Sequence, residues 1–215
     1  MCALASHYTV QIVLGTPAFL QSDHQLKLSV VETILQTNRT TLSSLSMLTT
    51  NHTVLAVARI PLYTLTAPAN NTWGLVLDGI RDPGNMGTII RLADWYNIPA
   101  LICSSDTVDL YNPKVIQASM GSFIRIPVYY THLPAWLHCN AWPIIGTFPE
   151  GHSIHHTRLP LPGLIVIGNE SHGISPAVLP YLQYKVSIPR YGYAASLNAA
   201  MATAIVCDYW RKPYS

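Results

Sequence analysis

Polar residues of types that can bind or act on a ligand follow a run of branched apolar residues within Gly163–Ser175. The run Leu164–Ile167 is typical of a strand that is buried on both faces. Gly168 ends this run, and the tetrad Asn169–His172 then supplies amide, carboxylate, hydroxyl and imidazole groups before Gly173. Glycine permits a close approach of the backbone to a ligand, and open α/β sheets bind ligands at the carboxyl ends of their strands. We therefore expect a ligand loop here.

A second stretch with chemical potential is Asp78–Thr88, which lies between an expected strand at Gly74–Leu77 and an expected helix at Ile89–Tyr96. Its three glycines and one proline predict a tight loop, whose amides and following helix amino terminus can face a ligand. The glycine spacing does not match the dinucleotide motif Gly-x-Gly-x-x-Gly. Asn85 is expected to cap the helix, and Arg91, nearly two turns further on, is expected to grip a phosphate.

The third stretch is Val186–Asn198, which runs into an expected helix at Ala199–Tyr209. A proline and a glycine break the chain after the strand, and Ser196 and Asn198 lie at the start of the helix. These features predict another ligand loop.

Each of the three stretches also has a plainer structural explanation. The first fits a polar turn before a helix that starts at Ser175 and Pro176. In the second, Asn85 can be a simple cap and Arg91 a solvated helix residue. In the third, Ser196 and Asn198 can serve only to cap a helix of small residues.

Composition excludes some classes of protein. The chain has 215 residues, of which 49% are hydrophobic and 10% charged, so it is rich in core and poor in surface charge. We therefore expect an oligomer. The longest apolar stretch, Ala199–Val206, is far shorter than the roughly 20 residues that span a bilayer, so no membrane helix is expected. A net charge of +2 gives only a faint nucleic-acid signal.

Cysteine and histidine usage gives weaker indications. The four cysteines show no Cys-x-x-Cys spacing, and Cys103 and Cys207 fall in apolar surroundings, so free thiols in a reducing cytoplasm are expected. His152, His155 and His156 form a local cluster that can bind a metal. No cysteine or nearby carboxylate completes a ligand set, so we expect no metal site.

The elements expected around these stretches divide the chain into two parts. Residues 1–66 predict a small αβ domain, 67–72 a polar linker, and 73–215 alternating strands and helices that form a parallel sheet covered on both faces. The first part begins abruptly on a strand, and we expect helical residues upstream of it. Further expected strands are Tyr8–Leu14, Val30–Leu35, Thr53–Ala58, Pro99–Cys103 and Trp142–Thr147, and further helices are Pro17–Leu28, Thr40–Leu48, Tyr111–Ala118 and His132–Cys139.

The three stretches together resemble the motifs of the SpoU family of RNA ribose methyltransferases, within the SPOUT class. The first motif is similar to Asn85–Arg91, the second to Ile167–Ser175 and the third to Ile188–Ala202, in the family's order. The resemblance covers about residues 73 to 210. Residues 8 to 60 resemble the carboxyl-terminal part of the ribosomal-protein-like, RNA-binding domain that often precedes these enzymes.

The resemblance implies an α/β fold whose carboxyl-terminal segment is threaded into a deep trefoil knot, which is rare among proteins. It also implies a homodimer, with the Asn85 helix and the last helix near the two-fold axis, and an S-adenosylmethionine pocket at the knot. The residues that the resemblance assigns to this cofactor are Thr147, Ile167, Gly168, Asn169, Gly173, Ile188, Ser196 and Leu197.

The activity implied is methylation of ribose 2′-hydroxyls in rRNA, in preference to tRNA, with Asn85, Arg91, Glu170, Ser196 and Asn198 at the catalytic site. The reaction must align the hydroxyl with the methyl carbon and ease loss of its proton. Removing the proton of a guanidinium near pH 7 would cost at least about 7 kcal/mol, so Arg91 is expected to clamp phosphate and hydroxyl rather than act as a base.

Glu170 is expected to orient Arg91 or the substrate, and Ser196 and Asn198 to position the ribose or Glu170. Many family members carry glutamate where this chain has Ala195, and a methyl group cannot accept the hydrogen bond that a carboxylate would. The alternative function is a noncatalytic, knotted RNA-binding or ribosome assembly factor. Loss of Arg91 or Asn198 would have favoured it, and both are present.

Overall fold

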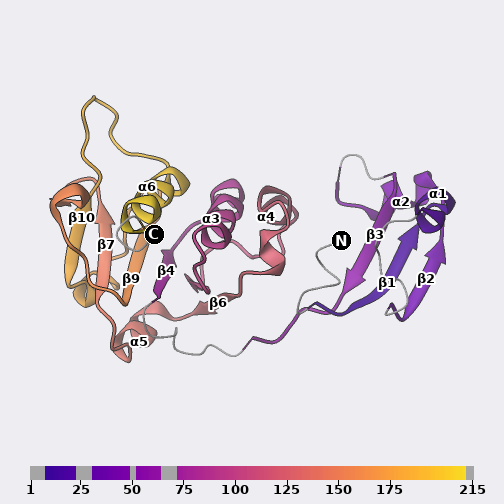
Figure 1. Ribbon diagram of the computed structural model, residues 1–215, viewed down its shortest axis with the longest axis horizontal. Helices are drawn as coiled ribbons and strands as arrows, with labels where there is room; N and C mark the ends of the chain where they lie inside the picture. The colour runs from indigo at the N-terminus through magenta and orange to yellow at the C-terminus, as the bar shows by residue number, and fades with distance from the viewer. Residues whose placement is uncertain (1–7, 23–30, 49–51, 64–71, 212–215) are drawn as a thin grey trace. The chain divides into compact units, whose positions relative to one another are not determined.

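The computed structural model describes residues 8–22, 31–48, 52–63 and 72–211 (Figure 1). The chain separates into two compact units, Met1–Tyr63 and Thr64–Ser215, each with its own sheet. The expected linker at 67–72 lies outside the described residues apart from Thr72, and so does the part of the expected helix Pro17–Leu28 that follows Ser22. Two separate sheets in one chain mean that each unit carries its own core.

The first unit is a three-stranded sheet in the order β2-β1-β3, in which β1 pairs parallel with β2 and antiparallel with β3. Val10 and Val13 on β1 and Leu42 on α2 are buried and form its core. Each of the three strands lies where the sequence predicted a strand. The elements are β1 Val10–Gly15, α1 Pro17–Gln21, β2 Thr33–Gln36, α2 Arg39–Leu45 and β3 Val54–Ala58.

The second unit contains a seven-stranded sheet in the order β6-β5-β4-β9-β7-β10-β8, and every pair of neighbours is parallel. The predicted parallel sheet is therefore confirmed. Its central strands are runs of apolar residues because a parallel sheet is covered on both faces. The strands are β4 Trp73–Asp78, β5 Leu101–Ser104, β6 Val128–Thr131, β7 Ile144–Phe148, β8 His152–Ser153, β9 Gly163–Gly168 and β10 Tyr184–Ser187.

Helices cover both faces of this sheet. Side chains alternate between the faces of a strand. Accordingly, Leu75 and Leu77 belong to one apolar cluster and Val76 to another. The first cluster includes residues of α3, α4 and α6, and the second includes residues of α5 (Figure 1). The helices are α3 Pro83–Trp95, α4 Pro113–Ala118, α5 Leu133–His138 and α6 Ala199–Arg211, with short 3-10 helices η3 Ser122–Ile124, η4 Ile154–His156 and η5 Leu179–Tyr181.

The start of α3 corrects the sequence prediction. The helix begins at Pro83, six residues earlier than expected, so the second half of the predicted loop is helical. Asp82 is the N-cap, and its side chain accepts a hydrogen bond from the Asn85 amide at 2.7 Å. Asn85 is therefore not the cap but lies in the first turn. Gly87 serves close packing, because a Cβ there would meet the Val115 carbonyl oxygen of α4 at 2.8 Å. Proline at the first helical position and a capping aspartate explain this start.

The residues after β9 do not follow the plainer structural explanation given for the first stretch. No α-helix starts at Ser175 and Pro176; a turn closed by the Val178 amide and the Ser175 carbonyl leads into η5. The ligand loop predicted in the stretch Val186–Asn198, here called the third ligand loop, begins after Ser187, where β10 ends. The trefoil knot that the family resemblance implies stays a prediction.

Two further expectations concern membranes and thiols. Among the helices that the structure describes, none is long and apolar enough to cross a membrane. Cys103 and Cys207 are buried free thiols, as predicted, while Cys139 is free and exposed; Cys2 lies outside the described residues. Burial raises the pKa of the Cys207 thiol to about 12 and also raises that of Cys103, so both stay protonated at neutral pH.

Candidate functional site

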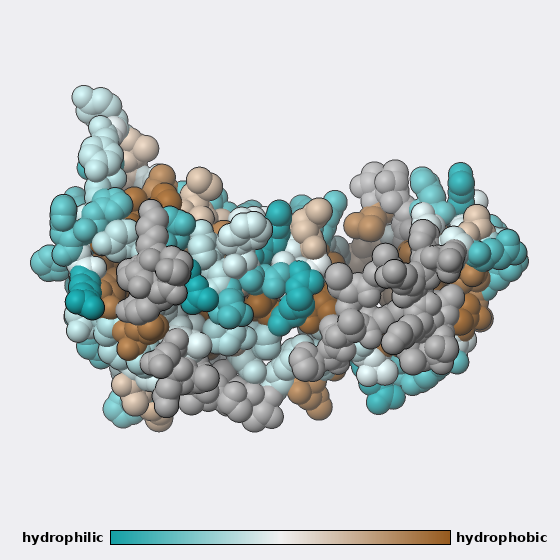
Figure 2. All heavy atoms as spheres, in the orientation of Figure 1, coloured by the Kyte–Doolittle hydropathy of each residue, from teal (hydrophilic) through white to brown (hydrophobic). Residues whose placement is uncertain are grey.

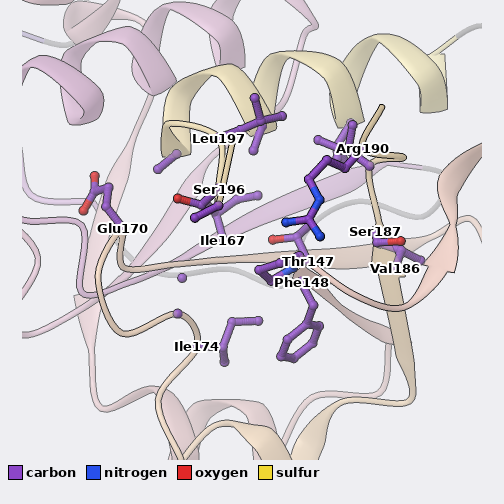
Figure 3. Close-up of a pocket in the computed structure, with 18 of the residues that line it drawn as sticks. Thr147, Phe148, Ile167, Glu170, Ile174, Val186, Ser187, Arg190, Ser196 and Leu197 are labelled. Carbon is purple, nitrogen blue, oxygen red and sulfur yellow. The ribbon is translucent and has the colours of Figure 1, made fainter. Parts of the chain in front are cut away.

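A cavity of about 700 Å³ lies at the carboxyl ends of β7, β9 and β10, where their loops converge (Figure 3). Parallel strands place their carboxyl ends at one edge, and β9 pairs with both β4 and β7. The loops that the sequence analysis selected after β9 and β10 both form its walls. The lining residues lie mainly in 147–149, 167–174, 186–192 and 194–197, with Ala199, Ala202 and Val206 of α6 closing one side.

The eight residues that the family resemblance assigned to a cofactor are brought together at this cavity. They come from the ends of β7 and β9 and from the loops after β9 and β10, up to 50 residues apart in sequence, and every one of them lines the same space. These residues are Thr147, Ile167, Gly168, Asn169, Gly173, Ile188, Ser196 and Leu197. The sequence therefore identified much of the wall of a single cavity.

The loop after β9 is held in a closed shape by its own backbone. The Asn169 amide donates to the Gly173 carbonyl at 3.0 Å, and the Gly173 amide returns a bond of 2.9 Å to the Asn169 carbonyl. Gly173 has a φ of +68°, which glycine adopts without strain. A Cβ at Gly168 would overlap the backbone of Gly173. Both glycines of the second motif therefore shape this loop, Gly173 through its positive φ and Gly168 through its close approach to the Gly173 backbone.

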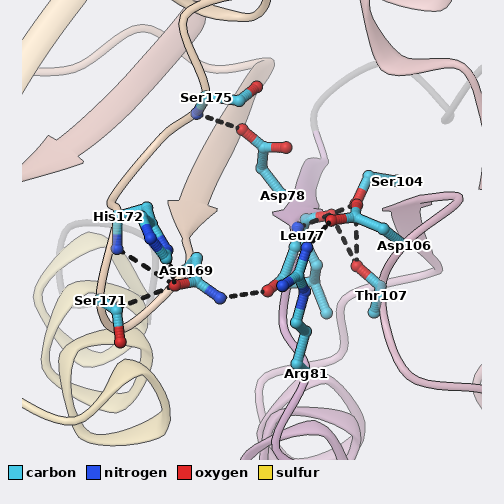
Figure 4. A network of polar contacts seen from close by, with 11 residues as sticks. Leu77, Asp78, Arg81, Ser104, Asp106, Thr107, Asn169, Ser171, His172 and Ser175 are labelled. Carbon is cyan, nitrogen blue, oxygen red and sulfur yellow. Dashed lines mark hydrogen bonds and ion pairs between the residues drawn. The ribbon is translucent and has the colours of Figure 1, made fainter.

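The side chain of Asn169 ties the loop to the neighbouring strand (Figure 4). Its Oδ1 accepts bonds from the amides of Ser171 and His172 at 2.9 and 3.1 Å, and its Nδ2 donates to the Gly79 carbonyl at 2.7 Å. The Ser175 amide donates to Asp78 Oδ2 at 2.7 Å. Asn169 therefore contributes to the cavity by fixing the loop, with both ends of its amide already bonded.

A polar cluster behind this contact fixes the turn after β4 (Figure 4). Ser104 Oγ accepts the Gly79 amide at 2.8 Å and donates to Asp106 Oδ1 at 2.7 Å, while Arg81 pairs with Asp106 at 3.0 Å. Hydrogen bonds from Ser104 and Arg81 hold the pKa of Asp106 below its usual value. The turn after β4 is therefore held by Asn169 at the Gly79 carbonyl and by Ser104 at the Gly79 amide.

Three of the five predicted catalytic residues form one chain of hydrogen bonds. Asn198 Oδ1 accepts the amides of Ala200 and Met201 at 2.9 and 3.2 Å, which makes Asn198 the cap of α6. Asn198 Nδ2 then donates to Asn85 Oδ1 at 2.7 Å, and Asn85 Nδ2 donates to Glu170 Oε1 at 2.5 Å. The direction of this chain is fixed, because backbone amides can only donate and a carboxylate accepts.

The other two predicted catalytic residues, Arg91 and Ser196, lie outside this chain. Ser196 lines the cavity and is exposed. Arg91 is exposed on α3 and makes no hydrogen bond or ion pair with any residue that the structure describes. Six residues separate Arg91 from Asn85, so their side chains project about 120° apart around the helix. The expected contact between Glu170 and Arg91 is absent among the described residues, and the side-chain hydrogen bond that Glu170 makes there goes to Asn85.

Arg190 is a site residue that the sequence analysis did not select. Among the described residues that line the cavity, it is the only lysine or arginine. Its side chain extends from the third loop toward Thr147 (Figure 3), and its Nη1 lies 3.4 Å from the Ala194 carbonyl oxygen. The sequence did contain a signal that could have identified this residue, because Arg190 is the one cation within the third motif.

The histidine cluster does not form a metal site within the described part of the chain. No group of three or more His, Cys, Asp or Glu side chains there is placed to hold a metal ion. His155 packs edge-on against the ring of Tyr209, with 5.4 Å between the ring centroids. This contact gives one of the three histidines a packing role.

Comparisons with known proteins agree with the geometry. Residues 73–208 match the SpoU rRNA Methylase family. The chain is 33% identical over 141 residues to the 23S rRNA (guanosine(2553)-2′-O)-methyltransferase RlmP of Bacillus subtilis, which covers 64% of this chain and 57% of that protein. It is 36% identical over 153 residues to the 23S rRNA (uridine(2479)-2′-O)-methyltransferase of Streptomyces viridochromogenes, covering 66% of this chain and 53% of that protein.

A solved structure is similar over more of its length. It is the SpoU methyltransferase AviRb of Streptomyces viridochromogenes in complex with the cofactor AdoMet, with a TM-score of 0.86 and 28% sequence identity. The match covers 99% of this chain and 86% of that one. The chain thus spans little more than half the length of the two curated relatives and most of the length of the solved structure.

Proposed function

The chain belongs to the SpoU rRNA methylase family, and on this basis we propose that it transfers a methyl group from S-adenosylmethionine to a ribose 2′-hydroxyl of RNA. The observation that carries the proposal is the cavity formed by the second and third motif loops, with the Asn198–Asn85–Glu170 chain beside it. The names of the two relatives describe this reaction on 23S rRNA, and the similar solved structure holds AdoMet.

The cavity fits such a cofactor in size and lining. Its volume of about 700 Å³ falls within the range of small-molecule pockets, which is roughly 300–1,000 Å³. Ile167, Ile188 and Leu197 offer apolar walls for an adenine ring, and the loop backbones offer amides and carbonyls. The guanidinium of Arg190 offers a partner for the carboxylate of the methionine portion. When bound, S-adenosylmethionine supplies a methyl group on a positively charged sulfur.

The protein's own residues would position the hydroxyl that attacks. Asn85 is only 8% exposed, so we assign it to positioning Glu170 rather than to contact with substrate. Glu170 has one oxygen bonded to Asn85, which leaves the other to accept a hydrogen bond from the substrate side. Arg91, exposed and unpaired within the described residues, is suited to hold an RNA phosphate and hydroxyl together through its planar fork. Alignment is then the main contribution of the site.

The substrate that we propose is rRNA, because the two relatives are named for 23S rRNA. Residues 1–66 would serve as part of an RNA-binding domain. Free, buried thiols at Cys103 and Cys207 support a reducing cytoplasm as the place of action. The knotted threading of the carboxyl-terminal segment is included in this proposal.

A homodimer completes the proposal. Helices α3 and α6 pack against each other in one apolar cluster, and each also exposes a large apolar side chain. Trp95 on α3 is 83% exposed and Met201 on α6 is 58% exposed. We propose that these two side chains are covered in the interface between the two copies. Light scattering at tens of micromolar should therefore show a dimer, and a monomer would contradict this part.

The deciding experiment is transfer of tritium-labelled methyl from S-adenosylmethionine to an unmodified 23S rRNA transcript, followed by mapping of 2′-O-methyl groups. Transfer to a ribose hydroxyl supports the proposal. The alternative is a noncatalytic RNA-binding or assembly factor. It would be supported if the folded protein bound this RNA and the cofactor but transferred no methyl group to the transcript or to cellular RNA from a strain that lacks the protein.

A further inference from the structure

Two tyrosines on the third ligand loop are almost fully exposed. Tyr191 is 93% exposed and Tyr193 is fully exposed. They flank Gly192, around which a Cβ would meet no atom within 4 Å. In Figure 1 the segment between β10 and α6 stands out from the sheet, and Figure 2 shows the same projection as a column that rises above the surface. Both aromatic rings are therefore free to be covered by a ligand.

The position of this loop relates it to the reaction. Tyr191 and Gly192 line the mouth of the cavity, so the loop starts at the wall of the proposed cofactor pocket. A nucleotide that presents its ribose to this wall of the pocket would therefore lie beside the loop. The segment from Ser187 to Cys207 contains no aspartate or glutamate and includes Arg190, so its charge does not oppose a polyanion.

Resting on the proposed function, we propose that Tyr191 and Tyr193 form a stacking surface for unpaired RNA bases next to the methylated ribose. Sequence-specific binding of RNA uses unstacked bases that lie on aromatic rings, and stacking tolerates any base because each has a π-face. Tyrosine presents a large rigid face at a small cost in side-chain entropy. The proposed ligand is therefore an unpaired base of an RNA loop or bulge, and not duplex RNA.

The chemistry of the site favours RNA over two other occupants of the loop. A lid over the cofactor would need both rings to face the cavity; Tyr191 lines the cavity, but Tyr193 does not. A contact with a second copy of the chain would follow the apolar faces of α3 and α6, whereas this loop projects beyond the body of the unit (Figure 1). Both occupants remain outcomes that the experiment can detect.

The experiment compares three variants of the full chain. Tyr191→Ala combined with Tyr193→Ala removes both rings, and Tyr191→Phe combined with Tyr193→Phe keeps them. Tyr184→Ala removes a partly exposed ring at the start of β10, at the end of the strand away from the cavity, and serves as the matched control. The probe is a fluorescein-labelled single-stranded RNA of twelve nucleotides, read by anisotropy, together with the same RNA carrying abasic sites.

The double alanine variant should bind the intact RNA at least about fivefold more weakly, the loss expected for one stacked base. The double phenylalanine variant and Tyr184→Ala should stay within about twofold of the parent. With abasic RNA the difference between the parent and the double alanine variant should disappear, because no base is present to stack. The Kd for S-adenosylhomocysteine, measured by calorimetry, should change less than the Kd for the intact RNA, because only Tyr191 of the two tyrosines lines the cavity.

Several results would overturn the inference. Unchanged RNA affinity in the double alanine variant would do so, as would an equal loss with abasic RNA. A loss confined to S-adenosylhomocysteine would show a cofactor lid, and a loss of the dimer in light scattering would show a contact between copies. If the parent methylates RNA while the double alanine variant binds RNA unchanged, only the stacking inference fails. A parent that binds no RNA overturns both this inference and the proposed function.

Discussion

Replacing the hydrogen-bond donor of Asn85 in the Asn198–Asn85–Glu170 chain by an acceptor should destabilise the protein. In Asn85→Asp the donor to Glu170 becomes an acceptor, and two carboxylate oxygens then meet where a bond of 2.5 Å existed. Loss of the bond costs about 1–3 kcal/mol when an acceptor is left unsatisfied. Two unit charges about 4 Å apart repel by about 4 kcal/mol at an effective dielectric constant near 20. Because Glu170 is only partly buried and can rotate away, we expect a net loss of about 2–4 kcal/mol.

The helix dipole by itself predicts that Asn85→Asp stabilises the protein, which is the opposite of the expected result. Asn85 lies in the first turn of α3, where an aspartate interacts favourably with the helix dipole by about 0.3–1 kcal/mol. A loss of stability therefore cannot arise from helix electrostatics. Thr88→Asp is the control, since Thr88 is exposed on the same helix and lies outside the Asn198–Asn85–Glu170 chain; its hydroxyl makes one exposed bond, to the Gly84 carbonyl at 2.8 Å. It should change stability by less than about 0.5 kcal/mol.

The compensating change is Glu170→Gln in the same chain. In Asn85→Asp combined with Glu170→Gln, one aspartate oxygen accepts from Asn198 and the other accepts from the new amide, so every bond of the chain is restored with its direction adjusted. This double variant should be at least about 2 kcal/mol more stable than the sum of the single changes predicts. Stability is the readout because removing the Glu170 carboxylate should itself reduce activity.

Thermal unfolding of the full chain measures these differences. For a protein of this size each 1 kcal/mol corresponds to a shift of about 2–4 °C in Tm, so Asn85→Asp should lower Tm by about 4–16 °C. If Asn85→Asp matches the parent, or the double variant shows no coupling, the direction of the chain described here is wrong.

Three further expectations follow from single side chains. Arg91→Ala should leave the Kd for S-adenosylmethionine within a few-fold of the parent yet cut single-turnover methyl transfer at least about a hundredfold. Arg91→Lys should rescue little of this transfer, because lysine lacks the planar fork of the guanidinium. Undiminished transfer in Arg91→Ala would make Arg91 a simple surface residue. Arg190→Ala should weaken S-adenosylmethionine about tenfold or more while leaving 5′-methylthioadenosine, which has no carboxylate, within about twofold, as measured by calorimetry. Equal losses for both ligands would rule out a carboxylate contact. The hydrogen bond from Arg125 is the largest cause that lowers the pKa of Asp94 below its usual 3.8, and Ser122 adds to it. A carboxylate whose pKa is lower in the folded than in the unfolded protein stabilises the fold above the unfolded pKa, and this stabilisation is lost as pH falls through the folded pKa. Asp94→Asn should therefore lower Tm at pH 7 and match the parent near pH 2. A difference in Tm that persists near pH 2 would contradict this origin.

The sequence by itself determined the local elements and the segments that form the site. Apolar runs such as Leu164–Ile167 predicted strands covered on both faces, because the pattern depends only on residues close together in the chain. Glycine and polar residue types identified the loops after β9 and β10. The start of α3 was also written in the sequence, in Asp82 and Pro83, but the neighbouring glycines led to the prediction of a loop.

Only the tertiary structure decided which of these residues meet. Glu170 and Asn198 reach Asn85 across 85 and 113 positions of the chain, and no local pattern encodes such contacts. The Glu170 contact arises because β4 and β9 are neighbours in a parallel sheet, which brings the end of one strand and the loop after another to a single edge. The Asn198 contact arises because α6, which Asn198 caps, packs with α3 in one apolar cluster. The position of Arg91 away from Glu170 likewise follows from the true start of α3 and the turn of the helix. Spacing along the chain identified the chemical groups, and the order of the strands determined their partners.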